Sequence, residues 1–481
     1  MNLRPLFLTQ TLSLVAIGLL TAVLSVTPEA DAATKSAPKA APVPVCESPF
    51  RHQRPAAKQL DKVLQSHARW LEDRNSADGH RANLCRTDLR QLRLVGANLE
   101  RINLEGANLT STNLRTANLV QAHLKGANLS HAMLDDANLE GADIRKGVLV
   151  KAHLNRVAAD EAAFYGANLQ GALLKEALLE RAHFEDADLQ LADLSSATLL
   201  DGYFYGANLP KANLTDADLA GTDLRRTNLR QATLRRANLQ GALLDSAVFD
   251  GASLVEAELD SAYLDDASLV KADLHEASLR GADLRYARLD GANLQRTNLE
   301  NANLEGARLI KARLDSALLT MTVLYKANLD AANLHGSRLH HAVLIDARLT
   351  RADLRKADLT EIYAPKARLQ QARLSEANLE LANLVAADLS QADLSHAVLV
   401  QTNLQEATLR NADLSAADLT GAQLNNANLQ QTNLRGANLS GALGLVQAQL
   451  EHACLDDTTR IPSDLQRPKP CPAAYPRPRR S

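Results

Sequence analysis

Carboxylates and imidazoles are the side chains of this sequence that could carry acid–base or metal chemistry. Asp188, Asp193 and Asp388 are among many acidic residues that directly precede a leucine, and paired carboxylates can hydrolyse glycosides. His340 and His341 are adjacent and could offer two nitrogens to a metal ion. Asn is also abundant at the Asp position, however, which favours a solvent-facing structural role. We therefore predict no catalytic residue, no metal site and no cofactor.

Sequence motifs of the common catalytic sites do not occur in the chain. It contains no GxSxG, no HExxH and no glycine-rich phosphate loop. The net charge of −3 creates no strong field that would favour nucleic acid. Hydrophobic residues make up 46% of the chain but aromatic residues only 3%. This composition, dominated by Ala and Leu, indicates a core assembled from many small identical units.

The four cysteines, Cys46, Cys85, Cys454 and Cys471, lie near the two ends of the chain. Four cysteines allow three pairings. Only Cys46–Cys85 with Cys454–Cys471 keeps each bridge local, and this is the pairing that we predict. Zinc ligation is the alternative, but no CxxC motif is present. Disulfides require an oxidising compartment, so the pairing predicts export.

The segment over residues 1–32 is typical of a secretory signal peptide. Arg4 provides a positive charge, residues 12–26 form an apolar run, and Ala30 and Ala32 are small residues before a cleavage point at Ala33. An uncleaved membrane anchor is the alternative. Residues 33–45 form an Ala/Pro linker that cannot bury a core. We expect an exported protein of the periplasm or cell envelope.

Residues 82–441 repeat in steps of five with the consensus A-[N/D]-L-x-x. The central Leu first occurs at Leu84 and returns at every fifth position to Leu439. A helix cannot place every fifth residue on one face, and a flat strand turns each successive Leu to the opposite side. The chain must therefore turn once in each pentad, which is the pattern of a solenoid.

This pattern resembles the pentapeptide-repeat family over about three-quarters of the chain. The resemblance implies an all-β solenoid, a right-handed quadrilateral parallel β-helix with four pentads in each 20-residue coil. About 18 coils are expected, with the central residue and the residue two before it pointing inward. The sequence offers a check on this period, because three central aromatic residues lie 20 apart and should stack. They are Phe164, Phe184 and Phe204, and Gly202 replaces the usual Ala before the last one.

Both ends of the repeat array differ from the consensus and predict caps. Residues 46–81 are expected to form a helical N-terminal cap, because 55–73 place apolar residues along one helical face. Residues 442–466 resemble the family's C-terminal ending, and the repeat register slips after Leu439. Residues 467–481 form a Pro/Arg-rich tail. Caps are needed because open solenoid ends would recruit further strands.

Sorting the pentads by the 20-residue period groups the tyrosines. All seven tyrosines of the repeats fall on the face whose central residues are 84, 104, 124 and so on, here called the tyrosine face. They are Tyr165, Tyr203, Tyr205, Tyr263, Tyr286, Tyr325 and Tyr363. Exposed Tyr is a preferred interface residue, so this face is the candidate binding face. Partial burial of the rings or duplication of an ancestral coil is the alternative, and FYGANL, which occurs twice, supports duplication.

Charge is also sorted by face. The face of 99, 119 and 139, the acidic face, has about 14 acidic and 4 basic residues. The face of 89, 109 and 129, the basic face, has about 12 basic and 6 acidic residues. Charged faces are most often only solvated, but opposite signs favour lateral self-association.

A non-catalytic binding or scaffolding protein of the bacterial cell envelope is the function that the sequence favours. Its partner would be a protein or another envelope component, bound through the solenoid surface, with no nucleic acid. Membrane attachment is expected only if the N-terminal segment is an uncleaved anchor. A DNA-mimicking, gyrase-binding protein of the quinolone-resistance type is a second class, which the export signal and mixed charge disfavour. A carbohydrate-active β-helix enzyme is a third.

Overall fold

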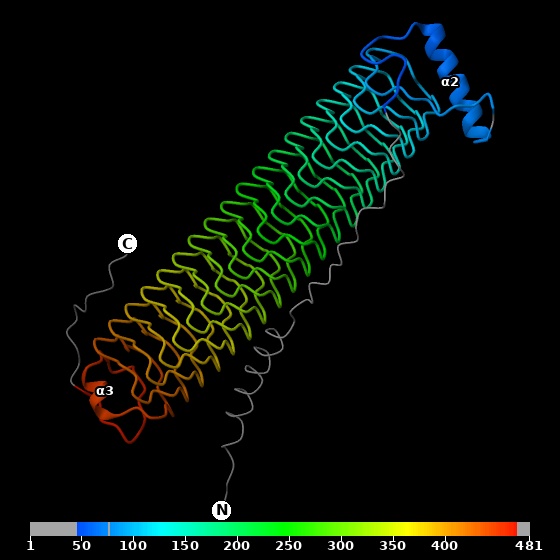
Figure 1. Cartoon of the computed structure of the whole chain (residues 1–481). Helices are drawn as coiled ribbons and strands as arrows, with labels where there is room; N and C mark the ends of the chain where they lie inside the picture. The colour runs from blue at the N-terminus through cyan, green and yellow to red at the C-terminus, as the bar shows by residue number, and fades with distance from the viewer. Residues whose placement is uncertain (1–45, 76, 469–481) are drawn as a thin grey trace, which may run out of the picture. The chain divides into compact units, whose positions relative to one another are not determined.

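The computed structural model describes residues 46–75 and 77–468 (Figure 1). The chain divides into two compact units. The described part of the N-terminal unit comprises residues 46–302, apart from 76, and Ala307–Ala317. The described part of the C-terminal unit comprises Asn303–Gly306 and residues 318–468. The same repeat runs through both units.

Parallel pairing between positions 20 apart builds both units. In the N-terminal unit Asn103 pairs with His123, and in the C-terminal unit Asp353 pairs with Arg373. Backbone hydrogen bonds accompany each pair; the N–H of Leu104, for example, donates to the carbonyl of His123 at 2.8 Å. These pairings confirm that one coil holds four pentads, so each unit is a four-sided parallel β-helix.

Every pentad ends in a tight turn. The amide of Ala107 donates to the carbonyl of Leu104 at 3.0 Å, which closes a β-turn. The second residue after the central one, here called the corner position, has a positive φ, as at Gly106 with φ 62°. Most corner positions are not glycine yet adopt the same left-handed conformation. This turn is why a period of five gives a solenoid and not a strand.

Central and small inward residues fill the interior of each unit. Leu104 and Ala107 are 1% and 0% exposed, and the same pattern repeats along the array. Phe164, Phe184 and Phe204 stack in successive coils, with ring centroids 4.7 and 4.8 Å apart. The predicted stacking and inward orientation are therefore confirmed.

The helix α2, Ala57–Glu72, covers the N-terminal end of the N-terminal unit (Figure 1). Leu60 and His67 are its buried residues. A Cβ on Gly79 would lie 2.7 Å from the backbone nitrogen of Trp70, so glycine lets the returning chain approach the helix. A disulfide joins Cys46 to Cys85, with 5.6 Å between the Cα atoms. This is the N-terminal pairing expected from the sequence.

The C-terminal unit ends in a change of register around the short helix α3, Gln447–Glu451. Gln423 pairs with Leu443, which keeps the regular coil spacing, whereas Asn433 pairs with Cys454 and Asn438 with Arg460. The Gln449 side chain donates to the carbonyls of Leu424 and Ala427, both at 2.8 Å. The Ala407 carbonyl, one coil earlier, accepts from the amide of Asn428 in the next coil, so Gln449 takes the place of a further coil at the carbonyl of Ala427.

Several predictions fall on residues outside the described part of the chain. These are the signal peptide with its cleavage point, the linker over 33–45, and most of the 467–481 tail. Cys454 is not a free cysteine, but its predicted partner Cys471 lies outside the described residues. Among the residues that are described, no helix has the length and apolar character needed to cross a membrane.

Candidate binding face and metal-ligand cluster

The tyrosine face of the N-terminal unit carries five of the seven tyrosines. Tyr165, Tyr205 and Tyr286 are 44%, 39% and 54% exposed, while Tyr203 and Tyr263 are half-buried. Tyr165 and Tyr205 both follow a central Phe, so the buried phenylalanine stack lies directly beneath them. The structure therefore places three of these five rings at the surface and agrees with the alternative of partial burial for the other two.

Neighbouring polar groups contact two of the exposed rings. The Tyr165 hydroxyl is hydrogen-bonded to the Asp186 carboxylate, which raises the pKa of Tyr165. The guanidinium groups of Arg225 and Arg226 lie 6.0 and 5.9 Å from the centre of the Tyr205 ring. Such cation–π contacts at exposed sites contribute about 0.5–1 kcal/mol. These contacts orient the rings while leaving much of their surface open.

The tyrosine face of the C-terminal unit is less exposed. Tyr325 and Tyr363 are both half-buried, and the Lys326 ammonium lies 4.6 Å from the Tyr325 ring centre. Its hydrogen bond with Tyr325 raises the pKa of Lys326. Val323 and Val343, which directly precede the central residues Leu324 and Leu344 of this face, are buried. This unit offers a weaker candidate surface than the N-terminal one.

Asp residues before the central Leu act as structural hydrogen-bond acceptors. Asp193 accepts from the amide of Ser195 at 3.1 Å and from the side chain of Asn213, one coil on, at 2.9 Å. Asp388 likewise accepts from the amide of Ser390 at 2.9 Å. These bonds brace the turn and join adjacent coils, which is the role that the sequence predicted for this position.

A different pair of carboxylates, not predicted from the sequence, stacks on the tyrosine face of the N-terminal unit. Burial raises the pKa of Asp245, and the charge of Asp265 raises it further. Burial also raises the pKa of Asp265, whereas Arg285 opposes the shift. Both residues directly follow a central Leu and lie one coil apart, a relation visible in the sequence once the coil period is known. This pair lines neither of two cavities that lie among the described residues of the C-terminal unit.

Those cavities do not resemble a catalytic cleft. One is a small void inside the core of the C-terminal unit, lined by apolar side chains around Ala364. The other has a volume of about 210 Å³ and is lined by Arg410, Gln430, Gln431 and His452. Neither brings two carboxylates together.

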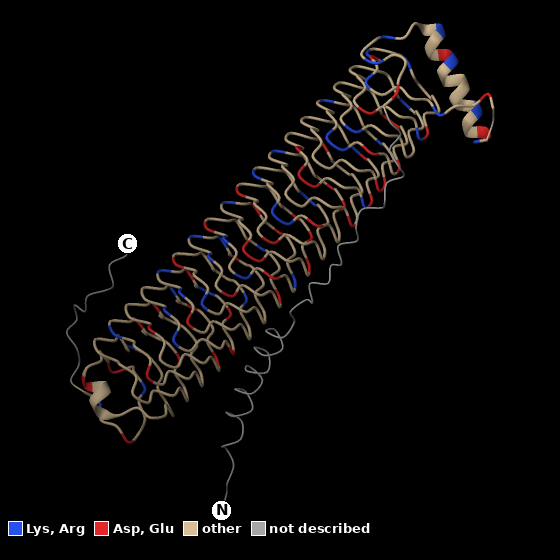
Figure 2. Cartoon of the chain, in the orientation of Figure 1, with Lys and Arg blue, Asp and Glu red and all other residues tan. Residues whose placement is uncertain are grey.

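Charge on both units is interspersed in sign along the coils (Figure 2). On the basic face, Arg308 pairs with Asp290 at 3.1 Å and Arg348 with Asp330 at 2.6 Å. Asp290 and Asp330 belong to the basic face itself and are two of its 6 acidic residues, so these pairs leave its excess of positive charge unchanged.

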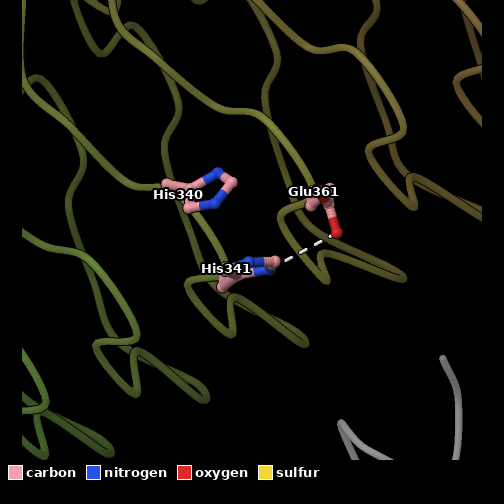
Figure 3. A group of neighbouring side chains, drawn as sticks. All are labelled: His340, His341 and Glu361. Carbon is pink, nitrogen blue, oxygen red and sulfur yellow. Dashed lines mark ion pairs between the residues drawn. The ribbon is translucent and has the colours of Figure 1, made fainter.

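His340 and His341 gain a neighbour that was not predicted from the sequence. Glu361 occupies the corner position one coil after His341, and a ligand atom of each of the three residues lies within 4.8 Å of the others (Figure 3). The two imidazole centroids are 3.8 Å apart, and His341 Nδ1 lies 3.6 Å from a Glu361 carboxylate oxygen. The 20-residue spacing of His341 and Glu361 is the signal that could have revealed this cluster.

Comparison with known proteins agrees with the repeat geometry. The family described as "Pentapeptide repeats (8 copies)" matches residues 82–320, 322–361 and 366–459 in overlapping segments. No curated protein sequence matches the chain at a significant level.

Several solved structures of repeat proteins resemble this chain. HetL, a pentapeptide repeat protein involved in heterocyst differentiation regulation from the cyanobacterium Nostoc sp. strain PCC 7120, is 34% identical over 47% of this chain and 88% of its own, with a TM-score of 0.21. QnrB1, a plasmid-mediated fluoroquinolone resistance protein, is 18% identical over 40% of this chain and 90% of its own, with a TM-score of 0.22. A pentapeptide repeat protein of the Arabidopsis thaliana thylakoid lumen is 25% identical over 22% and 71%, with a TM-score of 0.14.

Superpositions with TM-scores this low support no conclusion by themselves. The repeat match over most of the chain carries the assignment. Pentapeptide-repeat proteins fold as right-handed quadrilateral β-helices, in agreement with the four-sided 20-residue coils of both units. The chain belongs to the pentapeptide-repeat family.

Proposed function

We propose that this protein is an exported, non-catalytic binding or scaffolding protein of the bacterial cell envelope. Its binding surface is the tyrosine face of the N-terminal unit. The exposure of Tyr165, Tyr205 and Tyr286 on that one face is the observation that carries the proposal. Tyr combines an apolar ring with a polar tip and is enriched among residues that dominate interface energies.

The non-catalytic part of the proposal is supported by the roles of the carboxylates. Asp193 and Asp388 are engaged in turn and inter-coil hydrogen bonds and are not aimed at a cleft. The cavity near His452 is lined by Arg, Gln and His side chains, without the carboxylate pair that glycoside hydrolysis requires. A surface on which aromatic rings and charged groups recur in successive coils suits a macromolecular partner better than a small substrate.

Export is supported by the disulfide between Cys46 and Cys85, because disulfides persist in oxidising compartments. The apolar run over residues 12–26 supports the same route. The mature chain would begin at Ala33, and an intact-mass measurement on envelope material would identify its first residue. Retention of Met1 would replace cleavage by a membrane anchor.

The binding face is tested with a triple variant of the N-terminal unit. Tyr165→Ser and Tyr205→Ser remove two rings, and Tyr286→Asn removes the third with a residue that tolerates its φ of 57°. The matched control replaces Lys151, Lys211 and Lys271 by Asn; all three are exposed corner residues of the basic face in the same unit. Truncation of an interface hot spot costs about 2 kcal/mol or more of binding.

We expect both variants to melt near the wild type, since exposed substitutions alter stability by about 0.5 kcal/mol or less. Only the tyrosine variant should lose cross-linked partners in the native envelope fraction or lose self-association in sedimentation. Equal retention by the two variants would refute the role of the face. A large drop in melting temperature confined to the tyrosine variant would make the rings structural.

A further inference from the structure

The cluster of His340, His341 and Glu361 lies wholly within the C-terminal unit, apart from the exposed tyrosines. His341 and Glu361 occupy equivalent corner positions in successive coils, with φ values of 58° and 56°, so their Cα–Cβ bonds project in the same direction. His340 directly precedes His341, and its ring lies against that of His341. Figure 3 shows the three side chains on one side of the coil.

Two imidazoles and one carboxylate form a ligand set suited to a divalent transition ion. His₂Glu is the set that holds zinc in many sites, where water fills the fourth position. In a tetrahedral site, ligand atoms about 2.1 Å from the ion lie about 3.4 Å apart. The present atoms lie within 4.8 Å of one another, so closure onto an ion takes a shift of at most about 1.4 Å. The His341 and Glu361 side chains, 34% and 28% exposed, have room to rotate by that amount.

The surroundings of the cluster also favour a cation. It lies on the acidic face, where the pentads of Leu339, Leu359 and Leu379 contain Asp358 and Glu380 besides Glu361, and the cation Arg338. Apolar side chains occupy the corner positions on either side of the pair, since Met321 precedes His341 and Leu381 follows Glu361. Imidazole ligands prefer zinc, copper and nickel, whereas Mg²⁺ and Ca²⁺ prefer sets of oxygen ligands.

We propose that His340, His341 and Glu361 bind one Zn²⁺-class transition ion at the surface of the C-terminal unit. The ion would bridge two successive coils, because His341 and Glu361 come from adjacent ones. The fourth coordination position of the ion would face solvent and accept water or a donor atom from a partner. The site is independent of the tyrosine face and of the function proposed for it.

Isothermal titration of untagged protein with Zn²⁺ at pH 7.5, with Mg²⁺ as the comparison ion, tests this site. His341→Asn and Glu361→Gln each remove a ligand with residues that other corner positions already hold, such as Asn411 and Gln391. The matched control is His396→Asn, an exposed corner histidine of the same unit outside the cluster. Circular dichroism without metal verifies that each variant is folded.

We expect one Zn²⁺ per chain, at least tenfold weaker binding for either ligand variant, and unchanged binding for His396→Asn. Loss of outer-shell partners already weakens metal binding about 10–100-fold, so loss of a direct ligand should not cost less. Absence of binding by the wild type would overturn the proposal. Equal affinity in wild type and both ligand variants would also overturn it, by placing the ion elsewhere.

Discussion

Gly202 and Phe204 provide a quantitative test of the packing rule that the repeat imposes. An added Cβ at Gly202 would lie 3.1 Å from Cε2 of Phe204 and 2.9 Å from the carbonyl oxygen of Leu199. The first distance is shorter than ordinary van der Waals contact, and Phe204 is held by its stack on Phe184 at 4.8 Å. Gly202→Ala should therefore overpack the coil and destabilise it by about 1–3 kcal/mol.

Replacing the ring should relieve that strain. Phe204→Leu alone loses the aromatic pair with Phe184, worth about 0.5–1.5 kcal/mol beyond its buried area. The double variant restores the consensus Ala and Leu of other coils, so its cost should be smaller than the sum of the single costs. We expect a coupling free energy of about 1 kcal/mol or more in favour of the double variant.

Equilibrium unfolding in urea measures these differences. Circular dichroism follows the coils, and the fluorescence of Trp70, the single tryptophan, follows the cap of the same unit. Coincident transitions by the two probes are needed before free energies are compared. The control cycle combines Gly202→Ala with Phe249→Leu, a buried ring that lies more than two coils later and on another face.

Additivity within about 0.5 kcal/mol in the control cycle, with clear coupling in the Gly202 and Phe204 cycle, is the expected result. Equal additivity in both cycles would refute the reasoning. Phe164 and Phe184 keep Ala two residues before the ring, so glycine at 202 would then have no packing cause.

Two further predictions concern stability. Ala386 has a φ of 56°, and the adjacent Ala387 is buried. Ala386→Gly should stabilise the C-terminal unit by about 0.5–1 kcal/mol, because glycine adopts a positive φ without strain. Ala387→Gly should destabilise it, and denaturant midpoints would measure both changes. Stabilisation by both, or by neither, would contradict the role given to corner positions. Burial lowers the pKa of His67 below its usual 6.5, so the neutral form favours the folded cap. The free energy of unfolding of the cap should be greatest above about pH 6.5. It should fall by up to about 1.4 kcal/mol per pH unit as the pH decreases toward the lowered pKa of His67, which Trp70 fluorescence would measure. The same pH dependence in His67→Gln would exclude His67 as the cause.

A turn in each pentad follows from the amino-acid sequence alone, whereas the 20-residue coil and its inward positions are what the resemblance to the pentapeptide-repeat family implies. A Leu at every fifth position excludes both a helix and a flat strand, and the 20-residue spacing of Phe164, Phe184 and Phe204 indicates the number of pentads per coil. These inferences succeed because each pentad contacts mainly its equivalent one coil away, so local pattern and tertiary contact follow one rule. The N-terminal helix could likewise be predicted from its amphipathic pattern, and the disulfide from the number and positions of the cysteines.

The surface groups that meet across coils, in contrast, are known only from the folded chain. The sequence grouped the tyrosines on one face, but their exposure depends on neighbours such as Asp186 and Arg225 from the next coil. Glu361 joins His340 and His341 for the same reason, because positions 20 apart in sequence become adjacent only when coils stack. Interior positions are fixed by the repeat itself, whereas surface contacts depend on side-chain rotamers that the repeat leaves free.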